Sequence, residues 1–345
     1  MTELSRRNFI RFLAASLGSL GSLYLAGCLN QDKLLSRSIS PDKISPTPFV
    51  PDPTNTAAPE PTATDQPTDT PVPTPTPADL AVARNGKAED MVRAAVKALG
   101  GMGKFVKPGD SVVVKPNICV AYHTYEYAAT TNPWVVGTVV KLAVEAGAKS
   151  VKVMDFPFGG TGEQAYYKSG IQEQVQKAGG KMVVMSGVKF VKTDIPGGKD
   201  LKSARIFDDV LRADVLINVP IAKHHGLALL TLAMKNLMGV VWDRQIYHAY
   251  GLDQSIAEFC LFKKPDLNIV DAYRVIIRNG PRGYNPDDLI LSKNLLISED
   301  IVAVDTAACK IFGINPDKVD YLRMGHELKL GKKNLNDLNI KRLIL

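Results

Sequence analysis

The stretch that decides the predicted fold is residues 214–251, DVLINVPIAKHHGLALLTLAMKNLMGVVWDRQIYHAYG. It opens with the apolar, β-branched run Val215 to Val219, which predicts a buried strand that ends at Pro220. Side chains able to do chemistry follow this strand: Lys223, His224, His225, Thr231, Lys235, Asn236 and His248. In open α/β sheets, ligands bind beyond the carboxyl ends of the strands, so we expect the functional site here.

The segment after Leu229 is predicted to be helical, which would place Thr231 and Lys235 on one face, four residues apart. Apolar residues flank Lys235, and such a setting is costly for an ammonium group unless the group is paired or its pKa is depressed. The adjacent His224 and His225 would point in opposite directions on an extended backbone, so we expect only one of them to face the site.

Short apolar strands alternate with helices in the rest of the globular part. The predicted strands are 112–114, 151–154, 182–185, 267–270 and 295–297, and the predicted helices are 91–99, 133–147, 172–178, 252–262 and 305–312. Continuously apolar strands separated by helices are typical of parallel sheets that are buried on both faces. We therefore predict an α/β fold for residues 82–345, a mostly parallel sheet with helices on both faces, in one body or in two lobes.

Polar residues stand at the ends of several predicted strands: Lys115, Asn117, Asp155, Lys223 with His225, Asp271 and Asp300. Parallel strands bring their carboxyl ends to one edge of a sheet, so these side chains are expected to share a cleft. A single aspartate at such a position often only caps the following helix. The prediction therefore rests on the group of residues and not on any one member.

Residues 1–27 have the pattern of an export signal. Paired arginines in Ser5-Arg6-Arg7-Asn8-Phe9-Ile10-Arg11 precede an apolar segment of about 14 residues, too short to span a bilayer permanently. The arginine pattern resembles the twin-arginine signal, and Leu25-Ala26-Gly27-Cys28 resembles the bacterial lipobox. These resemblances imply export through the twin-arginine route and lipidation of Cys28, which would anchor an extracytoplasmic protein to the cell membrane.

A Pro- and Thr-rich segment, residues 28–81, follows the signal. Twelve of the chain's 22 prolines lie between residues 40 and 78. This composition cannot bury a core and predicts a disordered, extended linker that holds the globular part off the membrane.

Charge and cysteine usage narrow the classes of partner and cofactor. The formal net charge is +7 at pH 7, but the lysines are scattered as on a solvated surface, and an exported protein is not expected to bind nucleic acid. Beyond Cys28 the cysteines are Cys119, Cys260 and Cys309, far apart and without a C-x-x-C pair. No cysteine-ligated iron–sulfur cluster is therefore expected.

A set of motifs resembles the domain of unknown function 362 family over nearly all of residues 90–330. The motifs are Lys115-Pro116-Asn117, Pro220-x-x-Lys223-x-His225, Thr231-x-x-x-Lys235-Asn236-x-x-Gly239 and Asn279-Gly280-Pro281. The family carries no agreed general reaction. Some members also have a ferredoxin-like module with clustered cysteines, which this chain lacks.

The order His225, Lys235 and His248 resembles, more distantly, a segment of the nickel-pincer lactate racemases. The resemblance implies that His225 is an acid–base residue, that Lys235 anchors the cofactor covalently and that His248 ligates the metal. The interval from Lys235 to His248 is shorter here than in those enzymes. A second catalytic histidine would have to be His123 or His224.

The residue types themselves allow two kinds of site. Imidazoles of His225 and His248, with a carboxylate such as Asp243, could form an open site for nickel, iron or zinc. The alternative is an anion site, in which cationic, amide and hydroxyl groups donate to a carboxylate or phosphate. The donors of that site are Lys223, Lys235, Lys115, Asn117, Thr231 and Asn236.

Two functions follow from these sites. The first is a metal- or cofactor-dependent enzyme of redox or isomerase type that acts on a small anionic substrate, with His225, Lys235 and Lys223 as catalytic residues. The second is a non-catalytic lipoprotein that binds a small anionic ligand or cofactor. Metal analysis of the folded protein separates them, because a metal lost in a His248→Ala variant supports the enzyme.

Overall fold

The computed structural model describes residues 76–345. The predicted export signal, Cys28 and all but the last residues of the predicted linker lie outside this range. The first strand begins at Leu80, two residues before the predicted boundary of the globular part, because an apolar run follows the last proline almost at once. Within residues 76–345, no helix is both long enough and apolar enough to cross a membrane.

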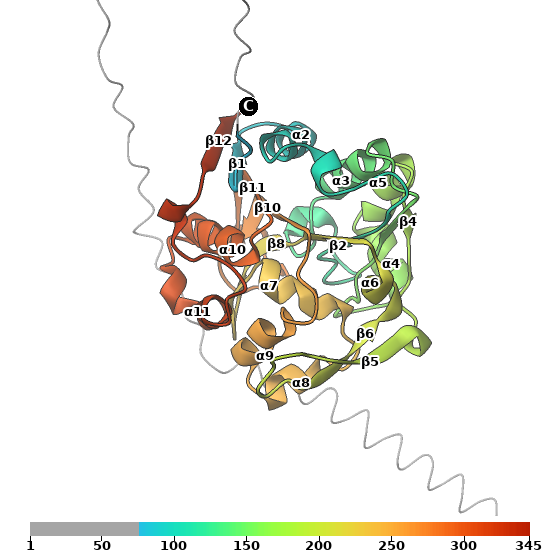
Figure 1. The fold of residues 1–345 in the computed structure, drawn as a ribbon, viewed down its shortest axis with the longest axis vertical. Helices are drawn as coiled ribbons and strands as arrows, with labels where there is room; N and C mark the ends of the chain where they lie inside the picture. The colour runs from blue at the N-terminus through green and yellow to red at the C-terminus, as the bar shows by residue number, and fades with distance from the viewer. Residues whose placement is uncertain (1–75) are drawn as a thin grey trace, which may run out of the picture. The chain divides into compact units, whose positions relative to one another are not determined.

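The fold is built on a ten-stranded mixed sheet with the order β12-β1-β11-β10-β7-β2-β3-β4, and β8 pairs with β10 and β9 (Figure 1). Its strands are β1 (Leu80–Arg84), β2 (Ser111–Pro116), β3 (Ser150–Val153), β4 (Lys181–Met182), β7 (Val215–Val219), β8 (Ile221–His225), β9 (Leu229–Thr231), β10 (Leu267–Ile276), β11 (Leu289–Ser298) and β12 (Ile340–Ile344). The pairs from β4 through β3, β2 and β7 to β10 are all parallel, whereas β11 runs antiparallel to both β10 and β1. The prediction of a mostly parallel sheet is confirmed.

Helices cover both faces of the sheet, as predicted. Alternate residues of β2 show the two faces, since Val112 and Val114 belong to one apolar core and Val113 belongs to the other. The first core is closed by α2 (Ala88–Ala98), α3 (Pro133–Glu145), α4 (Gly162–Lys168) and α5 (Ile171–Lys177). The second is closed by α6 (Asp208–Arg212), α7 (Ala233–Asn236), α8 (Gln245–Ala249), α9 (Leu252–Phe259), α10 (Ile301–Cys309) and α11 (Asp320–Glu327).

The helix starts follow local sequence chemistry. Asn132 caps α3 by accepting a hydrogen bond from the Trp134 amide, and Pro133 occupies the first helical position. Asp300 caps α10 by accepting from the amides of Val302 and Ala303. Because β11 is antiparallel, its last residue and Asp300 lie at the edge opposite the ends of the parallel strands. The prediction that Asp300 joins the shared cleft is therefore wrong.

The loop predicted after Pro220 is instead a β-hairpin. β7 ends at Val219 as predicted, but β8 follows Pro220 directly and pairs with β9, with Lys223 opposite Thr231. Thr231 is thus a strand residue, and α7 begins only at Ala233. The prediction that Thr231 and Lys235 share a helical face is wrong, because pairing with β8 determines the backbone as far as Thr231.

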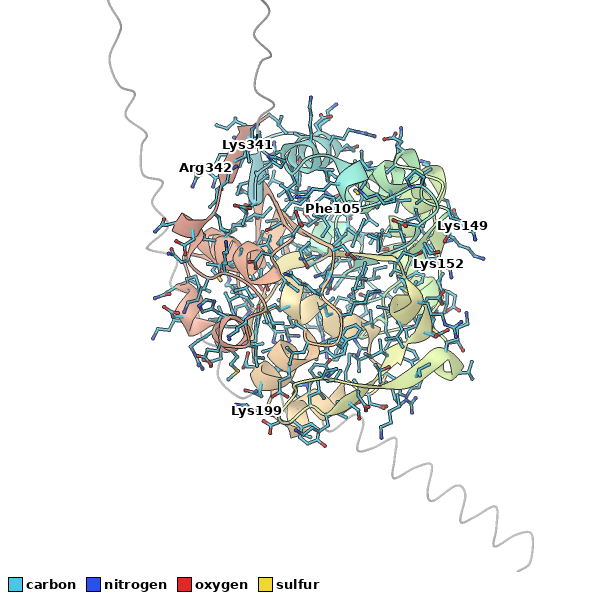
Figure 2. All side chains as sticks on the ribbon, viewed as in Figure 1. Phe105, Lys149, Lys152, Lys199, Lys341 and Arg342 are labelled. Atoms are coloured by element: carbon cyan, nitrogen blue, oxygen red, sulfur yellow. The ribbon has the colours of Figure 1, made fainter. Side chains whose placement is uncertain are left out.

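Other elements were not visible in the sequence pattern. β5 (Phe190–Asp194) and β6 (Ser203–Phe207) form a separate two-stranded antiparallel sheet, and α4 follows directly on a glycine-rich loop. Basic side chains are distributed over several parts of the surface, as Figure 2 shows for Lys149, Lys199 and Lys341.

Candidate functional site

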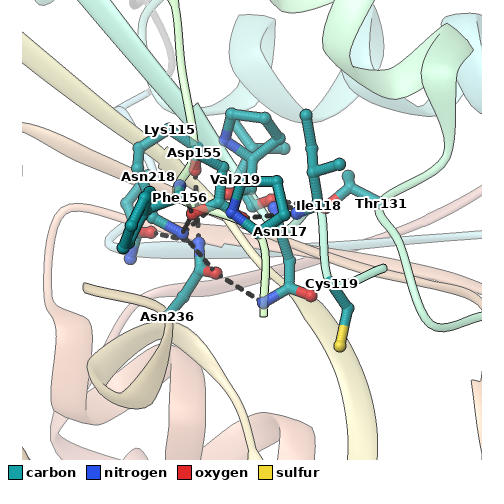
Figure 3. Close-up of polar contacts among 12 residues, drawn as sticks. Lys115, Asn117, Ile118, Cys119, Thr131, Asp155, Phe156, Asn218, Val219 and Asn236 are labelled. Carbon is teal, nitrogen blue, oxygen red and sulfur yellow. Dashed lines mark hydrogen bonds and ion pairs between the residues drawn. The ribbon is translucent and has the colours of Figure 1, made fainter. Parts of the chain in front are cut away.

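A buried ion pair lies at the carboxyl edge of the parallel strands. Lys115, near the end of β2, has no exposed surface, and its Nζ lies 2.7 Å from Oδ1 of Asp155, which follows β3. The same Nζ donates to the Asn236 Oδ1 at 2.9 Å and to the Pro116 carbonyl at 2.8 Å, so all three of its donors have acceptors (Figure 3). Burial lowers the pKa of Lys115, and the Asp155 carboxylate opposes this effect.

Side-chain amides join this ion pair to the neighbouring strands. Asn236 accepts from Lys115 and from Asn117 Nδ2 at 2.9 Å, and it donates to Asn218 Oδ1 at 2.8 Å. Asn218 lies within β7 and donates to Asn268 of β10 at 3.0 Å. The short helix α7 is thereby tied to β2 and β7 through the side-chain amide of Asn236, and Asn218 extends the network to β10.

Gly239 explains the glycine in the sequence motif. A Cβ at this position would overlap the Asp155 carboxylate and the Lys115 ammonium group. Its carbonyl accepts from the amide of Phe156, at 3.0 Å, which draws the backbone after α7 close to the end of β3. Only a residue without a side chain permits this approach.

Lys223 is the second buried lysine of the edge. It is 1% exposed, and its Nζ donates to Asn117 Oδ1 at 2.9 Å and to the Ala129 carbonyl at 2.6 Å. Burial lowers its pKa, and Cys119 and Asp155 oppose this shift, Cys119 both by its charge and by a hydrogen bond. Asn117 therefore connects Lys223 to Asn236, whose side-chain oxygen also accepts from Lys115.

The β8–β9 hairpin turns Lys223, His225 and Thr231 to one face. Residues two apart on a strand share a face, and residues directly opposite on antiparallel strands have neighbouring side chains. His224 points the other way, where its Nδ1 accepts from the Gly280 amide at 3.2 Å. Only one of the two adjacent histidines faces the lysines, as predicted. The Thr231 hydroxyl is buried and has no hydrogen-bond partner among the described residues.

His225 is held as a neutral imidazole. Its Nδ1 accepts from the amides of Leu227 and Ala228 at 3.2 and 3.1 Å, so the proton of the neutral ring is on Nε2. Burial holds the pKa of His225 well below its ordinary value, and Lys235, Lys223, His224 and His248 lower it further, in that order. The predicted catalytic residues therefore share one electrostatic neighbourhood.

Lys235 differs from the other two lysines because its ammonium group lacks the oxygen acceptors that the other two have within the described residues. It is half-buried, and within residues 76–345 its one hydrogen-bond contact is with the Met238 Sδ, at 3.8 Å. Burial, and after it the Lys223 charge, lower its pKa to about 8. An ammonium group in this setting is ready to donate to an incoming anion.

The predicted metal ligands are less closely arranged. His248 is exposed on α8, and burial together with Lys235 lowers its pKa. Asp243 lies 3.5 Å from Arg205 in an ion pair. Residues 76–345 contain no group of three His, Cys, Asp or Glu side chains that could hold one metal ion. Metal binding by His225 and His248 stays a prediction.

Two residues at this edge of the sheet, Cys119 and Asp305, were not predicted from the sequence. Cys119 follows Asn117 by two residues and lies near Lys223 and Lys235, so its position after a polar strand end was the available signal. Asp305 accepts from the amides of Ala233 and Met234 at 2.7 and 3.0 Å and thus holds the start of α7. Asp271 was predicted in the cleft, but its carboxylate accepts from the backbone amides of Asn132 and Tyr273.

An open hollow lies elsewhere on the described part of the chain. It has a volume of about 680 Å³ and is bordered by α4, α5 and β4. Its lining includes Tyr166, Gln176 and Met182, and none of the buried lysines. We place the candidate site at the lysines because charge, burial and unpartnered donors coincide there.

These features define a class of protein, an α/β protein with a basic site at the carboxyl edge of a mixed sheet. The chain belongs to the family described as Domain of unknown function (DUF362), which matches residues 112–310 and was predicted from the sequence motifs. A thylakoid-associated protein of Synechocystis sp. is 30% identical over 247 residues, which are 69% of this chain and 74% of that protein.

Two solved structures share part of the fold. The lactate racemase apoprotein from Thermoanaerobacterium thermosaccharolyticum is 11% identical with a TM-score of 0.43, over 67% of this chain and 56% of its own. A protein from Thermotoga maritima is 11% identical with a TM-score of 0.40, over 65% of this chain and 59% of its own. The chain thus spans less than two thirds of either structure, and both likenesses concern the fold alone.

Proposed function

We propose that this chain is an enzyme of isomerase or redox type that binds a small anionic substrate between Lys223, Lys235 and His225. The observation that carries the proposal is the set of unused donors on one side of the site. Lys235 has no oxygen acceptor, and the buried Thr231 hydroxyl has no partner among the described residues. Buried donors without acceptors are costly, and a bound carboxylate or phosphate would satisfy them.

Two of these groups can move protons near neutral pH. Lys235, with a pKa of about 8, is present in both its charged and its neutral form in mildly alkaline solution. His225 carries its proton on Nε2 and is neutral, so this atom can donate to an oxygen that gains negative charge. Lys115 and Asn236 position α7, and their hydrogen-bonding capacity is already used within the protein.

A metal or a pincer-type cofactor remains part of the prediction. Lys235 is half-buried, His248 is exposed on α8, and both lower the pKa of His225. The Nδ1 of His225 already accepts two backbone hydrogen bonds, which leaves only a protonated Nε2 in the neutral ring. This tautomer of His225 does not fit a metal centre held by that residue, so no step of the proposed chemistry involves a metal.

We also propose that the protein is extracytoplasmic and anchored by a lipid on Cys28 after twin-arginine export. Support comes from the two sequence patterns at residues 5–11 and 25–28. A relative whose name describes it as thylakoid-associated agrees with a location at a membrane. Labelled palmitate should be incorporated into the wild-type protein and not into a Cys28→Ala variant, and incorporation into both would contradict lipidation at Cys28.

The catalytic proposal is tested with full-length protein and a panel of small 2-hydroxy and 2-oxo carboxylates. Binding is measured by calorimetry, and conversion is followed by chiral chromatography and by NMR. We expect binding that weakens at least about tenfold in Lys235→Met, as for loss of one charge-assisted donor. The matched control is Lys177→Met, which removes an exposed lysine of α5 that pairs with Glu173.

The outcomes separate the two functions predicted from the sequence. Binding with conversion supports the enzyme. Binding without conversion of any carboxylate, by protein that carries no metal, supports the non-catalytic lipoprotein. If Lys235→Met and Lys177→Met bind alike, the lysine site is not the place where the anion binds.

A further inference from the structure

Cys119 occupies a fixed position beside the unused donors. Its amide donates to the Thr130 hydroxyl at 3.3 Å, and its carbonyl accepts from the amide of Phe158 at 2.8 Å. The side chain is half-buried and turns away from the Lys115 network (Figure 3). Its sulfur lies 3.9 Å from the Pro281 carbonyl. The backbone is thus fixed while the thiol remains accessible.

Its surroundings differ from those of the other two cysteines in the described range. Cys119 influences the pKa of both Lys223 and Lys235, so its sulfur lies within electrostatic reach of two ammonium groups. Cys260 and Cys309 are buried in the apolar core, and burial raises the pKa of both thiols. Apolar burial makes a thiol inert, whereas the Cys119 thiol is half-buried and lies beside polar groups.

A second observation points independently to a ligand at this place. The Thr231 side chain is 4% exposed, and its hydroxyl has no partner within residues 76–345. Thr231 is directly opposite Lys223 in the hairpin, so its hydroxyl shares the face from which Lys223 reaches Asn117 and Cys119. The Thr231 hydroxyl and the Lys223 ammonium group therefore share the face of the hairpin that meets the segment of Asn117 and Cys119.

We propose that Cys119 is a nucleophile that adds to the carbonyl carbon of a small 2-oxo carboxylate whose carboxylate is bound by Lys235, Lys223 and Thr231. This inference rests on the proposed anion site and names the substrate class of that site. In the step, a bond forms between the sulfur and the carbonyl carbon, and the carbonyl π bond becomes a C–O single bond. The thiol proton passes to that oxygen, and the product is a hemithioacetal without any oxidant or reductant.

The experiment compares alkylation by iodoacetate and iodoacetamide in the full-length protein, followed by peptide mass spectrometry. Both reagents form a sulfur–carbon bond and release iodide, but only iodoacetate carries a carboxylate. In wild type we expect the ratio of the iodoacetate to the iodoacetamide rate at Cys119 to exceed that of a small free thiol by about tenfold or more, because a cationic site concentrates anions. Cys260 and Cys309 should stay unmodified while the protein is folded.

Variants and a competitor identify the groups responsible. Lys235→Met should bring the rate ratio at Cys119 down to that of a free thiol, whereas Lys177→Met should leave it unchanged. Glyoxylate should protect Cys119 from both reagents, with much less protection in Lys235→Met. Acetate, which has no carbonyl carbon to attack, should slow iodoacetate while protecting less against iodoacetamide.

These experiments distinguish failure of the Cys119 nucleophile from failure of the proposed anion site. If carboxylates bind by calorimetry but Cys119 has the rate ratio of a free thiol, the nucleophile is refuted and the anion site stands. Equal protection by glyoxylate and acetate against iodoacetamide also refutes the covalent step. If no carboxylate binds and the rate ratio is ordinary, both proposals fail together.

Discussion

Lys115 and Lys235 lie at the same edge of the sheet, yet their surroundings are opposite. All three donors of Lys115 have oxygen acceptors, and a full carboxylate is one of them. Within residues 76–345, the one hydrogen-bond contact of the Lys235 ammonium group is with a thioether sulfur. Burial lowers the pKa of both groups, so burial alone does not separate a structural lysine from one that binds a ligand. The number of acceptors left open separates them.

This contrast divides the site into two regions. The closed region, formed by Lys115, Asp155 and Asn236, ties the strand ends to α7 and should determine stability. The open region, formed by Lys235, Thr231 and Cys119, should determine binding. Substitutions in the two regions are therefore expected to have different effects, with stability lost in the first and ligand affinity lost in the second.

The largest effect is expected from Lys115→Met. The change leaves the buried Asp155 carboxylate without its cation and the Asn236 oxygen without its strongest donor. Removing one partner of a buried ion pair typically costs about 3–5 kcal/mol. Urea unfolding should show this loss as a lower midpoint with an unchanged slope. A loss below about 1 kcal/mol would mean that the closed region does not stabilise the fold.

A somewhat smaller effect is expected from pH, through Asp305 beneath α7. Burial raises the pKa of this carboxyl to about 7, although the amides of Met234 and Ala233 oppose the shift. The folded protein then keeps this proton up to about pH 7, while the unfolded chain releases it near pH 4. Stability should fall as pH rises between these values, by at most about 1.4 kcal/mol per pH unit and about 4 kcal/mol in total.

Asp305→Asn tests this linkage because the amide does not titrate. Urea unfolding of both proteins between pH 4.5 and 7.5 should give a smaller decline of stability with pH in the variant. The other buried carboxyl with a raised pKa, Asp271, is present in both proteins, and its pKa of about 6 adds the same decline to each. Parallel curves for the two proteins would show that Asp305 is not protonated in the fold.

Gly239→Ala should have the next largest effect. The added Cβ would overlap both partners of the Lys115–Asp155 pair, so either the pair or the backbone after α7 must shift. Overpacking of this kind costs about 1–3 kcal/mol. Gly103→Ala is the control, because a Cβ at Gly103 would have no neighbouring atom within 4 Å. Equal unfolding midpoints for the two variants would contradict the close approach of the Gly239 backbone to Lys115 and Asp155.

Much of the fold could be predicted because its signals are local. The strand at 112–114 and the helix that starts at Pro133 depend on short apolar runs and on a cap formed within three residues. The edge of the sheet that carries the site was also predicted, since parallel strands place Lys115 and Lys223 together. The family followed from motifs whose spacing is a property of the sequence alone.

The rest could not be predicted because it depends on pairing between distant segments. Nothing local indicates that β11 is antiparallel and carries Asp300 to the far edge. The polar sequence around Lys223 and His225 becomes a strand only because β9 and β10 pair with it. Cys119 has no cysteine partner in sequence, and the lysines whose pKa it affects come from β8 and α7.

The smallest effect on stability, and the sharpest test of the open region, is expected from Lys235→Met. Methionine has a similar length and removes a desolvated charge without an acceptor, so the free energy of unfolding should change by less than about 1 kcal/mol or rise. Phosphate or oxalate should raise the melting temperature of wild type but not of this variant, because a ligand stabilises only the protein that binds it.

The pH dependence of that stabilisation follows from the pKa of Lys235. The group loses its charge as pH rises through about 8, so the shift of melting temperature caused by oxalate should be full near pH 6.5 and decline above pH 8. An anion bound only by exposed lysines would keep its effect until about pH 10, the ordinary range of a lysine. Persistence of the full shift at pH 9.5 would therefore place the anion outside the open region.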